Sequence, residues 1–155
     1  MRARSLIAVA ALCVATLGGS VRAEPAIQTA TTTPAGLDYL QYCSGCHQRD
    51  GSGSAGNHVP RLPDSVGHFT RSAAGRAFLI QVGGVAQSPL SDEAVAALLN
   101  WLLPTFDQAN ISSEFIPYSA AEVNVARNSR PADLMAARAQ LAAALALQGH
   151  VVSNY

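Results

Sequence analysis

The stretch QYCSGCHQRDGSG, residues 41–53, places two cysteines and a histidine within five residues of one another. Cys43, Cys46 and His47 form the pattern C-x-x-C-H, which is typical of covalent haem attachment. Two thiols at this spacing can add to the two vinyl groups of one haem, and the adjacent imidazole then lies under the iron as its proximal ligand. The pattern therefore predicts one covalent haem c, attached through both cysteines and ligated by the histidine.

Two other kinds of site use the C-x-x-C spacing, and the sequence disfavours both. A structural zinc site needs four nitrogen or sulfur ligands, and the nearest additional ones are His58 and His68 in a loop-rich region. A thiol-disulfide oxidoreductase places its C-x-x-C after a strand, at the start of a helix. No alternation of polar and apolar residues indicates such a strand before Cys43.

The N-terminal segment has the organisation of a secretory signal peptide. Two arginines precede an apolar run at residues 6–17, and a small-residue site ends at Ala23. The run is shorter than the ~20 residues needed to cross a bilayer. We expect cleavage after Ala23 to remove residues 1–23, which leaves no stable membrane anchor and places the protein in the periplasm. Cys13 leaves with this segment, so no disulfide framework remains.

The mature chain is mildly acidic, because from residue 24 onward it carries ten carboxylates, seven arginines and no lysine. Nucleic-acid binding would need a basic stripe, so we expect no nucleic-acid partner. No Ser/His/Asp group or pair of carboxylates stands out to suggest hydrolysis. These features favour a carrier of a bound cofactor over an enzyme with its own catalytic side chains.

All the predicted elements are helices, which makes the expected fold class all-α. A flexible leader rich in Thr, Ala and Pro is expected over residues 24–35, followed by a short helix that enters the cysteine motif. A second helix is predicted within residues 72–84. The clearest helix spans residues 91–104, with Ser91 as its N-cap and Pro104 as its terminator.

A C-terminal extension is predicted over residues 107–155, with two further helices. A capping box at Ser119 opens the first, and Pro131 is expected in the first turn of the second, which runs to Gly149. Apolar positions of the second helix line one face: Leu134, Ala137, Leu141, Ala144 and Leu145. We expect this face to pack on the preceding domain, and an enzyme subunit is the alternative partner.

Residues 36–106 resemble a class I c-type cytochrome. The resemblance is carried by the cysteine motif and by residues on both sides of it: Gly36, Tyr39, Asp50-Gly51-x-Gly53, Pro60-x-Leu62 and Leu99-Asn100-Trp101. It implies a helical haem domain in which the carbonyl group of Pro60 orients the ring of His47 and Leu62 packs on the haem face. A ring nitrogen fixed in this way is what an iron-ligating imidazole requires.

The chain departs from this family at the sixth iron position. The family's distal ligand is usually a methionine in the loop before the final helix, which here is residues 82–92 and contains none. Met135 is the only methionine after the initiator, and His68 is the other weak candidate. The sequence therefore predicts that the absorption band of a sulfur-ligated ferric haem is absent unless Met135 folds back. Arg71 and Arg76 are candidates for pairing with the haem propionates.

The function that the resemblance implies is electron transfer. An exported carrier of this kind accepts an electron from a periplasmic dehydrogenase and passes it to an oxidase or another acceptor, alone or as the cytochrome subunit of an oxidoreductase. The alternative, supported by the missing loop methionine, is a five-coordinate haem protein that binds NO, CO or peroxide as a sensor or weak peroxidase. Peroxide chemistry would also need a distal acid-base residue and a cation near the iron.

Overall fold

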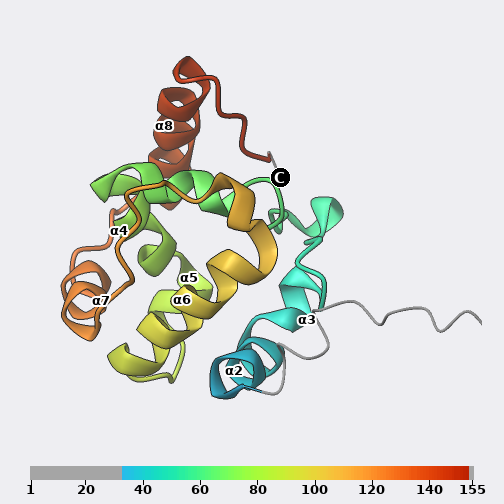
Figure 1. Ribbon diagram of the computed structural model, residues 1–155, viewed down its shortest axis with the longest axis vertical. Helices are drawn as coiled ribbons and strands as arrows, with labels where there is room; N and C mark the ends of the chain where they lie inside the picture. The colour runs from blue at the N-terminus through green and yellow to red at the C-terminus, as the bar shows by residue number, and fades with distance from the viewer. Residues whose placement is uncertain (1–32, 154–155) are drawn as a thin grey trace, which may run out of the picture.

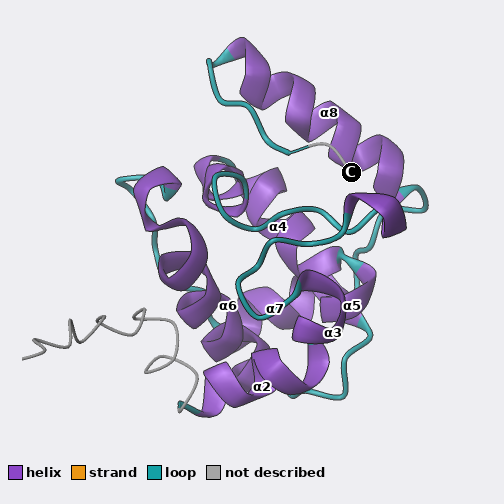
Figure 2. Ribbon diagram, turned by 90° about the vertical axis from the view of Figure 1, so that its right-hand side faces the viewer, coloured by secondary structure: helices purple, strands orange, loops and turns teal. Residues whose placement is uncertain are grey.

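The computed structural model describes residues 33–153, and the regular elements in this range are helices (Figures 1 and 2). In chain order they are α2 (Pro34–Tyr42), α3 (Ser44–His47), η1 (Ala55–Asn57), η2 (Val66–Arg71), α4 (Ala73–Gln81), α5 (Gly83–Ala86), α6 (Asp92–Asp107), η3 (Gln108–Asn110), α7 (Ala120–Arg127) and α8 (Leu134–Leu147). The only β-type pairing within residues 33–153 is an isolated bridge between Ser54 and Val59. The predicted all-α fold is confirmed. The predicted signal peptide, residues 1–23, lies outside the described range.

The first described helix begins earlier than predicted. α2 starts at Pro34, inside the stretch 24–35 that the sequence predicts to be a leader. The side-chain oxygen of Thr33 accepts a hydrogen bond of 3.1 Å from the backbone N–H of Gly36, which caps the helix. Pro34 occupies the first turn, where its missing N–H would have no helical partner in any case. The Thr- and Pro-rich composition therefore contains a helix start signal, and the rest of the leader lies outside the described residues.

α6 packs against α2, α7 and η2, so it is the helix on which the domain is assembled. Ser91 caps it as predicted, by accepting a hydrogen bond of 3.2 Å from the backbone N–H three residues later. The prediction that Pro104 ends this helix is wrong, because α6 continues through it. Leu103 and Phe106, on either side of the proline, are buried. Burial of such side chains stabilises the fold by about 1.5–3 kcal/mol each, which offsets the ~3 kcal/mol cost of an internal proline.

An aromatic cluster joins α2 to α6. Tyr39 is fully buried, and its ring centroid lies 5.5 Å from that of Trp101 and 4.9 Å from that of Phe106. The Tyr39 hydroxyl donates a hydrogen bond of 2.6 Å to the carbonyl oxygen of Gln48, so its burial leaves no unsatisfied donor. Gln48 directly follows the cysteine motif, and this bond therefore ties the motif to the contact between the two helices.

The C-terminal extension packs on the domain through α7, which lies against α4 and α6 (Figure 1). Just before α7, the backbone N–H and C=O of Tyr118 make hydrogen bonds of 2.8 and 3.0 Å with the side-chain amide of Asn100. On α7, the Glu122 carboxylate accepts two hydrogen bonds from the Arg76 guanidinium, of 2.9 and 2.8 Å. Such bidentate pairs are among the stronger side-chain contacts. The sequence analysis named two surfaces on which the extension could pack, the preceding domain and an enzyme subunit. In this single chain the extension packs on the preceding domain.

The last helix, α8, begins later than predicted. The Asp133 side chain caps it by accepting a hydrogen bond of 2.9 Å from the backbone N–H of Ala136. The prediction that Pro131 lies in the first turn is therefore wrong, since this proline precedes the cap. Ala144 is exposed, and the other apolar positions predicted to share a face pack against the core: Leu134, Ala137, Leu141 and Leu145.

After α8 the chain turns and comes back against η2, and residues 150–153 are called the return segment below. The rings of His68, on η2, and His150 stack with their centroids 4.8 Å apart. His68 is buried, and its Nδ1 atom has no hydrogen-bond partner among the described residues. Burial lowers the pKa of His68, and the neighbouring His150 lowers it further. This contact therefore holds a neutral imidazole between the domain and the end of the extension.

We predict that acidification weakens this contact. Because the pKa of His68 is lowered in the folded protein, the unfolded chain binds the proton more readily once the pH falls below the ordinary value of about 6.5. The stability is therefore complete above that pH and is lost as the pH falls. In urea titrations between about pH 8 and about pH 5, the free energy of unfolding should fall more steeply for the wild type than for His68→Gln. Equal slopes would contradict this assignment.

Candidate haem site

An apolar cavity of about 450 Å³ lies between the cysteine motif, α4, α6 and the start of α8. Its volume falls in the range typical of cofactor sites. Buried side chains of η2, α4 and α6 form much of its wall: Val66, Phe69, Phe78, Leu79, Leu98 and Leu102. Such a wall favours a large apolar group over water. The hydrophobic core of the domain therefore contains a cavity large enough for a cofactor.

The cysteine motif lines one side of this cavity. α2 ends at Cys43, whose backbone N–H still donates to the carbonyl oxygen of Tyr39 at 2.9 Å. The carbonyl oxygen of Cys43 then accepts hydrogen bonds from the N–H groups of Cys46 and His47, at 3.1 and 2.9 Å. This single turn, α3, brings both cysteines and the histidine to the same cavity. The three residues predicted to hold the haem are thus brought together.

The His47 ring is held by a backbone carbonyl. Its Nδ1 atom lies 3.1 Å from the carbonyl oxygen of Pro60, which also lines the cavity. With the proton on Nδ1 as the donor, the lone pair of Nε2 is left for a metal ion. Burial lowers the pKa of His47, and the hydrogen bond to Pro60 opposes that shift. The neutral imidazole that a metal ion requires is therefore favoured.

A glycine allows the proline to reach the histidine. Gly53 has a φ angle of +69°, and its backbone N–H donates a hydrogen bond of 3.0 Å to the carbonyl oxygen of His47. A Cβ atom on Gly53 would lie 2.5 Å from the carbonyl oxygen of Val59 and 2.7 Å from that of Pro60. Only glycine fits both this φ angle and this close approach. The Gly-rich loop after the motif is therefore shaped so that the Pro60 carbonyl lies beside the ring.

Leu62 completes this side of the site. Its backbone N–H donates a hydrogen bond of 2.8 Å to the carbonyl oxygen of Gly51, and its side chain is 7% exposed and lines the cavity. Gly51 also has a positive φ angle, of +72°, and packs against the Phe106 ring. The loop from the motif to Leu62 is therefore held in place at Gly51 and at Gly53.

The cysteine motif matches neither of the two alternative sites. Burial raises the pKa of Cys43 to about 11, and Asp38 and Cys46 contribute to the increase. Redox-active cysteines have the opposite shift, towards the thiolate. Within residues 33–153, no group of three His, Cys, Asp or Glu side chains is placed to hold a metal ion, as the zinc alternative would need.

Other residues predicted for the haem site lie away from the cavity. His68 is absent from the cavity wall and stacks on His150 instead. The Arg71 guanidinium donates a hydrogen bond to the carbonyl oxygen of Asn110, at 3.3 Å. Arg76 is engaged with Glu122 on α7, as described above. Arg71 and Arg76, the two candidates for the propionates, are therefore not among the residues that line the cavity, because their positions on η2 and α4 direct them to the extension.

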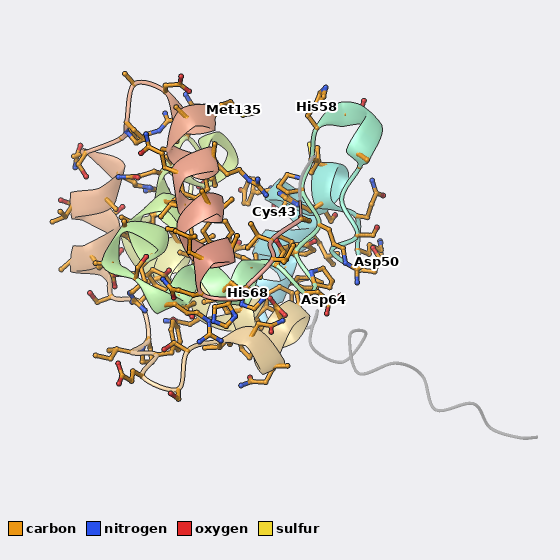
Figure 3. All side chains as sticks on the ribbon, turned by 90° about the horizontal axis from the view of Figure 1, so that it is seen from above. Cys43, Asp50, His58, Asp64, His68 and Met135 are labelled. Atoms are coloured by element: carbon orange, nitrogen blue, oxygen red, sulfur yellow. The ribbon has the colours of Figure 1, made fainter. Side chains whose placement is uncertain are left out.

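Two arginines that sequence reasoning missed line the cavity instead. Arg61 lies between Pro60 and Leu62, and Arg138 lies on α8 and is only 6% exposed. Met135, one helical turn before Arg138, also lines the cavity, so the extension contributes to the site (Figure 3). The sequence carried a signal for this, because positions 135 and 138 share a helix face, but only the position of α8 shows where that face points.

These features together define a class of protein. A helical domain in which a C-x-x-C-H turn lines an apolar cavity, with the histidine held by a proline carbonyl, is a c-type cytochrome domain. No family model matches the chain. Cytochrome c-552 of Thermus thermophilus is 31% identical over 126 residues, which cover 68% of this chain and 95% of the relative. A second cytochrome c-552 from the same species is also 31% identical, and 84% of that relative is covered. The chain belongs to the c-type cytochromes, which are electron carriers that bind haem c.

We predict that Gly53→Ala disturbs the position of the His47 ring, whereas Gly56→Ala does not. The added Cβ atom meets two carbonyl oxygens and a φ angle that alanine disfavours, at a cost on the order of 1–3 kcal/mol. Haem content per polypeptide and thermal stability should both fall. Gly56→Ala is the matched control, because its Cβ atom would meet nothing within 4 Å. A Gly53→Ala protein with wild-type haem content and melting temperature would contradict the role given to this glycine.

Proposed function

We propose that this protein is an exported electron carrier with one covalent haem c, attached through Cys43 and Cys46 and ligated by His47. The observation that supports the proposal most directly is the hydrogen bond between His47 Nδ1 and the Pro60 carbonyl oxygen, on the wall of an apolar cavity that both cysteines share. The thiols, the oriented imidazole and a space of cofactor size occur together. Neither the zinc alternative nor the disulfide alternative uses all three.

The haem supplies a one-electron couple, between Fe(III) and Fe(II), when it is bound. The chain's own residues then have three tasks. Pro60 orients the proximal imidazole, Leu62 and the buried side chains of α4 and α6 exclude water, and the cysteines hold the haem edge near the surface. Cys46 is exposed and Cys43 is half-buried, which suits electron exchange with a partner protein at this edge. A periplasmic dehydrogenase is the proposed donor, and an oxidase or another redox protein is the proposed acceptor.

The two cavity arginines are proposed to bind the haem propionates. A buried guanidinium such as that of Arg138 is favoured by a nearby carboxylate, with which it can form two parallel hydrogen bonds. Arg61 lies at the cavity with its side chain half-exposed and paired with the exposed carboxylate of Asp64 at 2.8 Å. Exposed ion pairs of this kind contribute little to stability, so a propionate could replace or join Asp64 as the partner of Arg61. Arg138 belongs to the extension, so this assignment gives the extension a role in holding the cofactor.

The proposed location is the periplasm, after cleavage of residues 1–23. Among the described helices, none is long and apolar enough to cross a membrane. The proposal of export rests on the apolar run and cleavage site at the N-terminus. Secretion of the haem-bearing chain from a bacterial host, followed by N-terminal sequencing, would locate the cleavage site.

We predict that expression with a haem-attachment system yields a red protein whose colour stays with the polypeptide during acid–acetone extraction. Replacing Cys43 and Cys46 together by serine should abolish attachment, because serine cannot form the thioether bond. The domain should then lose much of its thermal stability, since the cavity wall packs on the porphyrin. Complete extraction of the colour from the wild type would refute the covalent haem c.

We also predict a reversible one-electron couple in protein-film voltammetry of the purified holoprotein, because the proposed haem would exchange electrons at its exposed edge and His58, the one histidine besides His47 that the described residues bring to the cavity, belongs to the loop that holds the proximal ligand. Addition of peroxide should leave the voltammogram without a catalytic current. A large catalytic current with peroxide would instead support the sensor or peroxidase alternative.

A further inference from the structure

We propose that Met135, in the first turn of α8, supplies the distal ligand of the haem iron. This inference rests on the proposed function, since it presumes a haem in the cavity with His47 as its proximal ligand. It gives the C-terminal extension a direct part in the redox site.

The segment before α6 offers no ligand of its own. Residues 82–92 contain no Met, His, Cys, Tyr or Lys. The part of this segment that lines the cavity consists of Val82, Gly83, Gly84 and Val85, whose side chains carry no lone pair. The first two residues of α5 are glycines, so α5 presents little side-chain volume to the cavity there. An open side of this kind leaves room for a side chain from another element.

α8 directs one face of its first turns at this space. Leu134, Met135 and Arg138 all line the cavity. Arg138 is buried, whereas Met135 is 57% exposed. A methionine side chain is unbranched and has three rotatable bonds, so its sulfur atom can adjust its position without movement of the helix. An exposed methionine at a cavity wall contributes little to packing, and iron ligation would give it a function.

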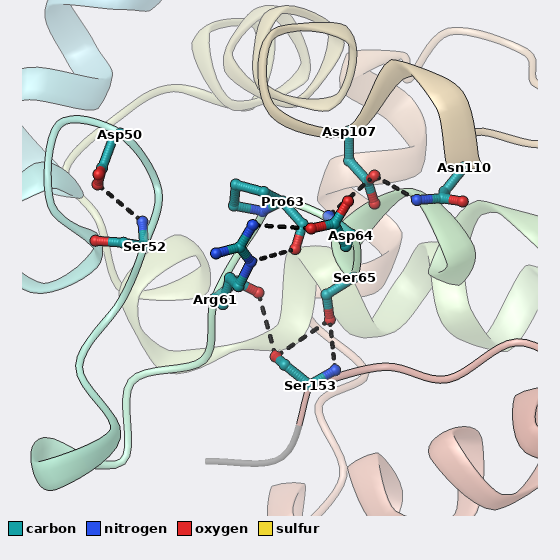
Figure 4. Close-up of polar contacts among 9 residues, drawn as sticks. All are labelled: Asp50, Ser52, Arg61, Pro63, Asp64, Ser65, Asp107, Asn110 and Ser153. Carbon is teal, nitrogen blue, oxygen red and sulfur yellow. Dashed lines mark hydrogen bonds and ion pairs between the residues drawn. The ribbon is translucent and has the colours of Figure 1, made fainter.

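The start of α8 is held in place by contacts with the proximal side of the site. The Arg138 guanidinium donates a hydrogen bond to the carbonyl oxygen of Ser153 in the return segment. The N–H of Ser153 donates to the Ser65 hydroxyl at 3.1 Å, and the Ser153 hydroxyl donates to the carbonyl oxygen of Arg61 at 3.3 Å (Figure 4). Arg61 directly follows Pro60, which holds His47. The helix that carries Met135 is therefore tied to the segment that orients the proximal ligand.

The remaining nitrogen and oxygen donors at the cavity are less suited to the distal side. His58 belongs to the same loop as Pro60, and Tyr42 immediately precedes Cys43, so both belong to the proximal segments. Figure 3 shows Met135 on α8 and His58 on the loop after the cysteine motif, apart from each other. Met135 reaches the cavity from α8, a helix that carries neither the cysteine motif nor the loop with Pro60.

The test compares the holoprotein with Met135→Leu, which keeps the side-chain volume and removes the sulfur atom. A thioether bound to ferric haem gives a weak charge-transfer band near the red end of the visible spectrum, and such ligation raises the reduction potential. We expect the wild type to show the band, and Met135→Leu to lose it, to have a lower potential and to bind CO rapidly in the ferrous state. Met135→His should restore a six-coordinate spectrum without the sulfur band.

A positional control uses the exposed neighbour Ala136. The double variant Met135→Leu, Ala136→Met returns a thioether to the helix away from the cavity wall, and it should not recover the band. A band that is absent from the wild type, or that survives Met135→Leu, overturns the inference, and so does rapid CO binding by the wild type. Acid–acetone extraction distinguishes failure of the Met135 assignment from failure of the proposed haem attachment. Haem that stays attached in a protein without the band refutes only Met135 ligation, whereas extractable haem refutes the proposed function itself.

Discussion

The hydrogen bond between His47 Nδ1 and the Pro60 carbonyl oxygen joins the two segments on which the site depends. It sets the tautomer of the imidazole, and it requires the loop between motif and proline to double back closely. That path is open only because Gly53 has no side chain where two carbonyl oxygens approach. The loop is in turn anchored by the bond from the Tyr39 hydroxyl to Gln48 and by the contact of Gly51 with Phe106. One polar contact therefore links the cavity to the packing of α2 on α6.

The C-terminal extension packs closely on the rest of the protein. α7 covers α4 and α6 through paired polar contacts, with Asn100 and Arg76 as the residues on the domain side. α8 then closes over the cavity, and the return segment fastens it to residues 61–65. A domain with a large apolar cavity buries less surface against itself, so added helices that cover the rim compensate in part. The same helices can supply side chains to the site that the shorter fold lacks.

The corrections to the sequence-based predictions have a common cause, which is competition between local signals and tertiary burial. Pro104 is a strong local stop signal, yet α6 continues because Leu103 and Phe106 are buried on either side of it. Arg71 and Arg76 are candidates for the propionates by their position in the sequence, but they are engaged by Asn110 and Glu122 of later elements. Local patterns specify which elements form, and contacts distant in sequence decide what their surfaces meet.

The sequence by itself determined the helical class, the C-x-x-C-H motif and the caps of α6 and α7 at Ser91 and Ser119. These features depend on spacing within a few residues, which a sequence records directly. The contact between His47 and Pro60 was expected from the family resemblance, and the cap of α8 at Asp133 was missed. Only the tertiary structure decided that Met135 and Arg138 face the cavity while His68 stacks on His150 away from it. Residues 47 and 135 are far apart in the chain, and they line one cavity because of how α8 packs and because the return segment holds it, which no local pattern encodes.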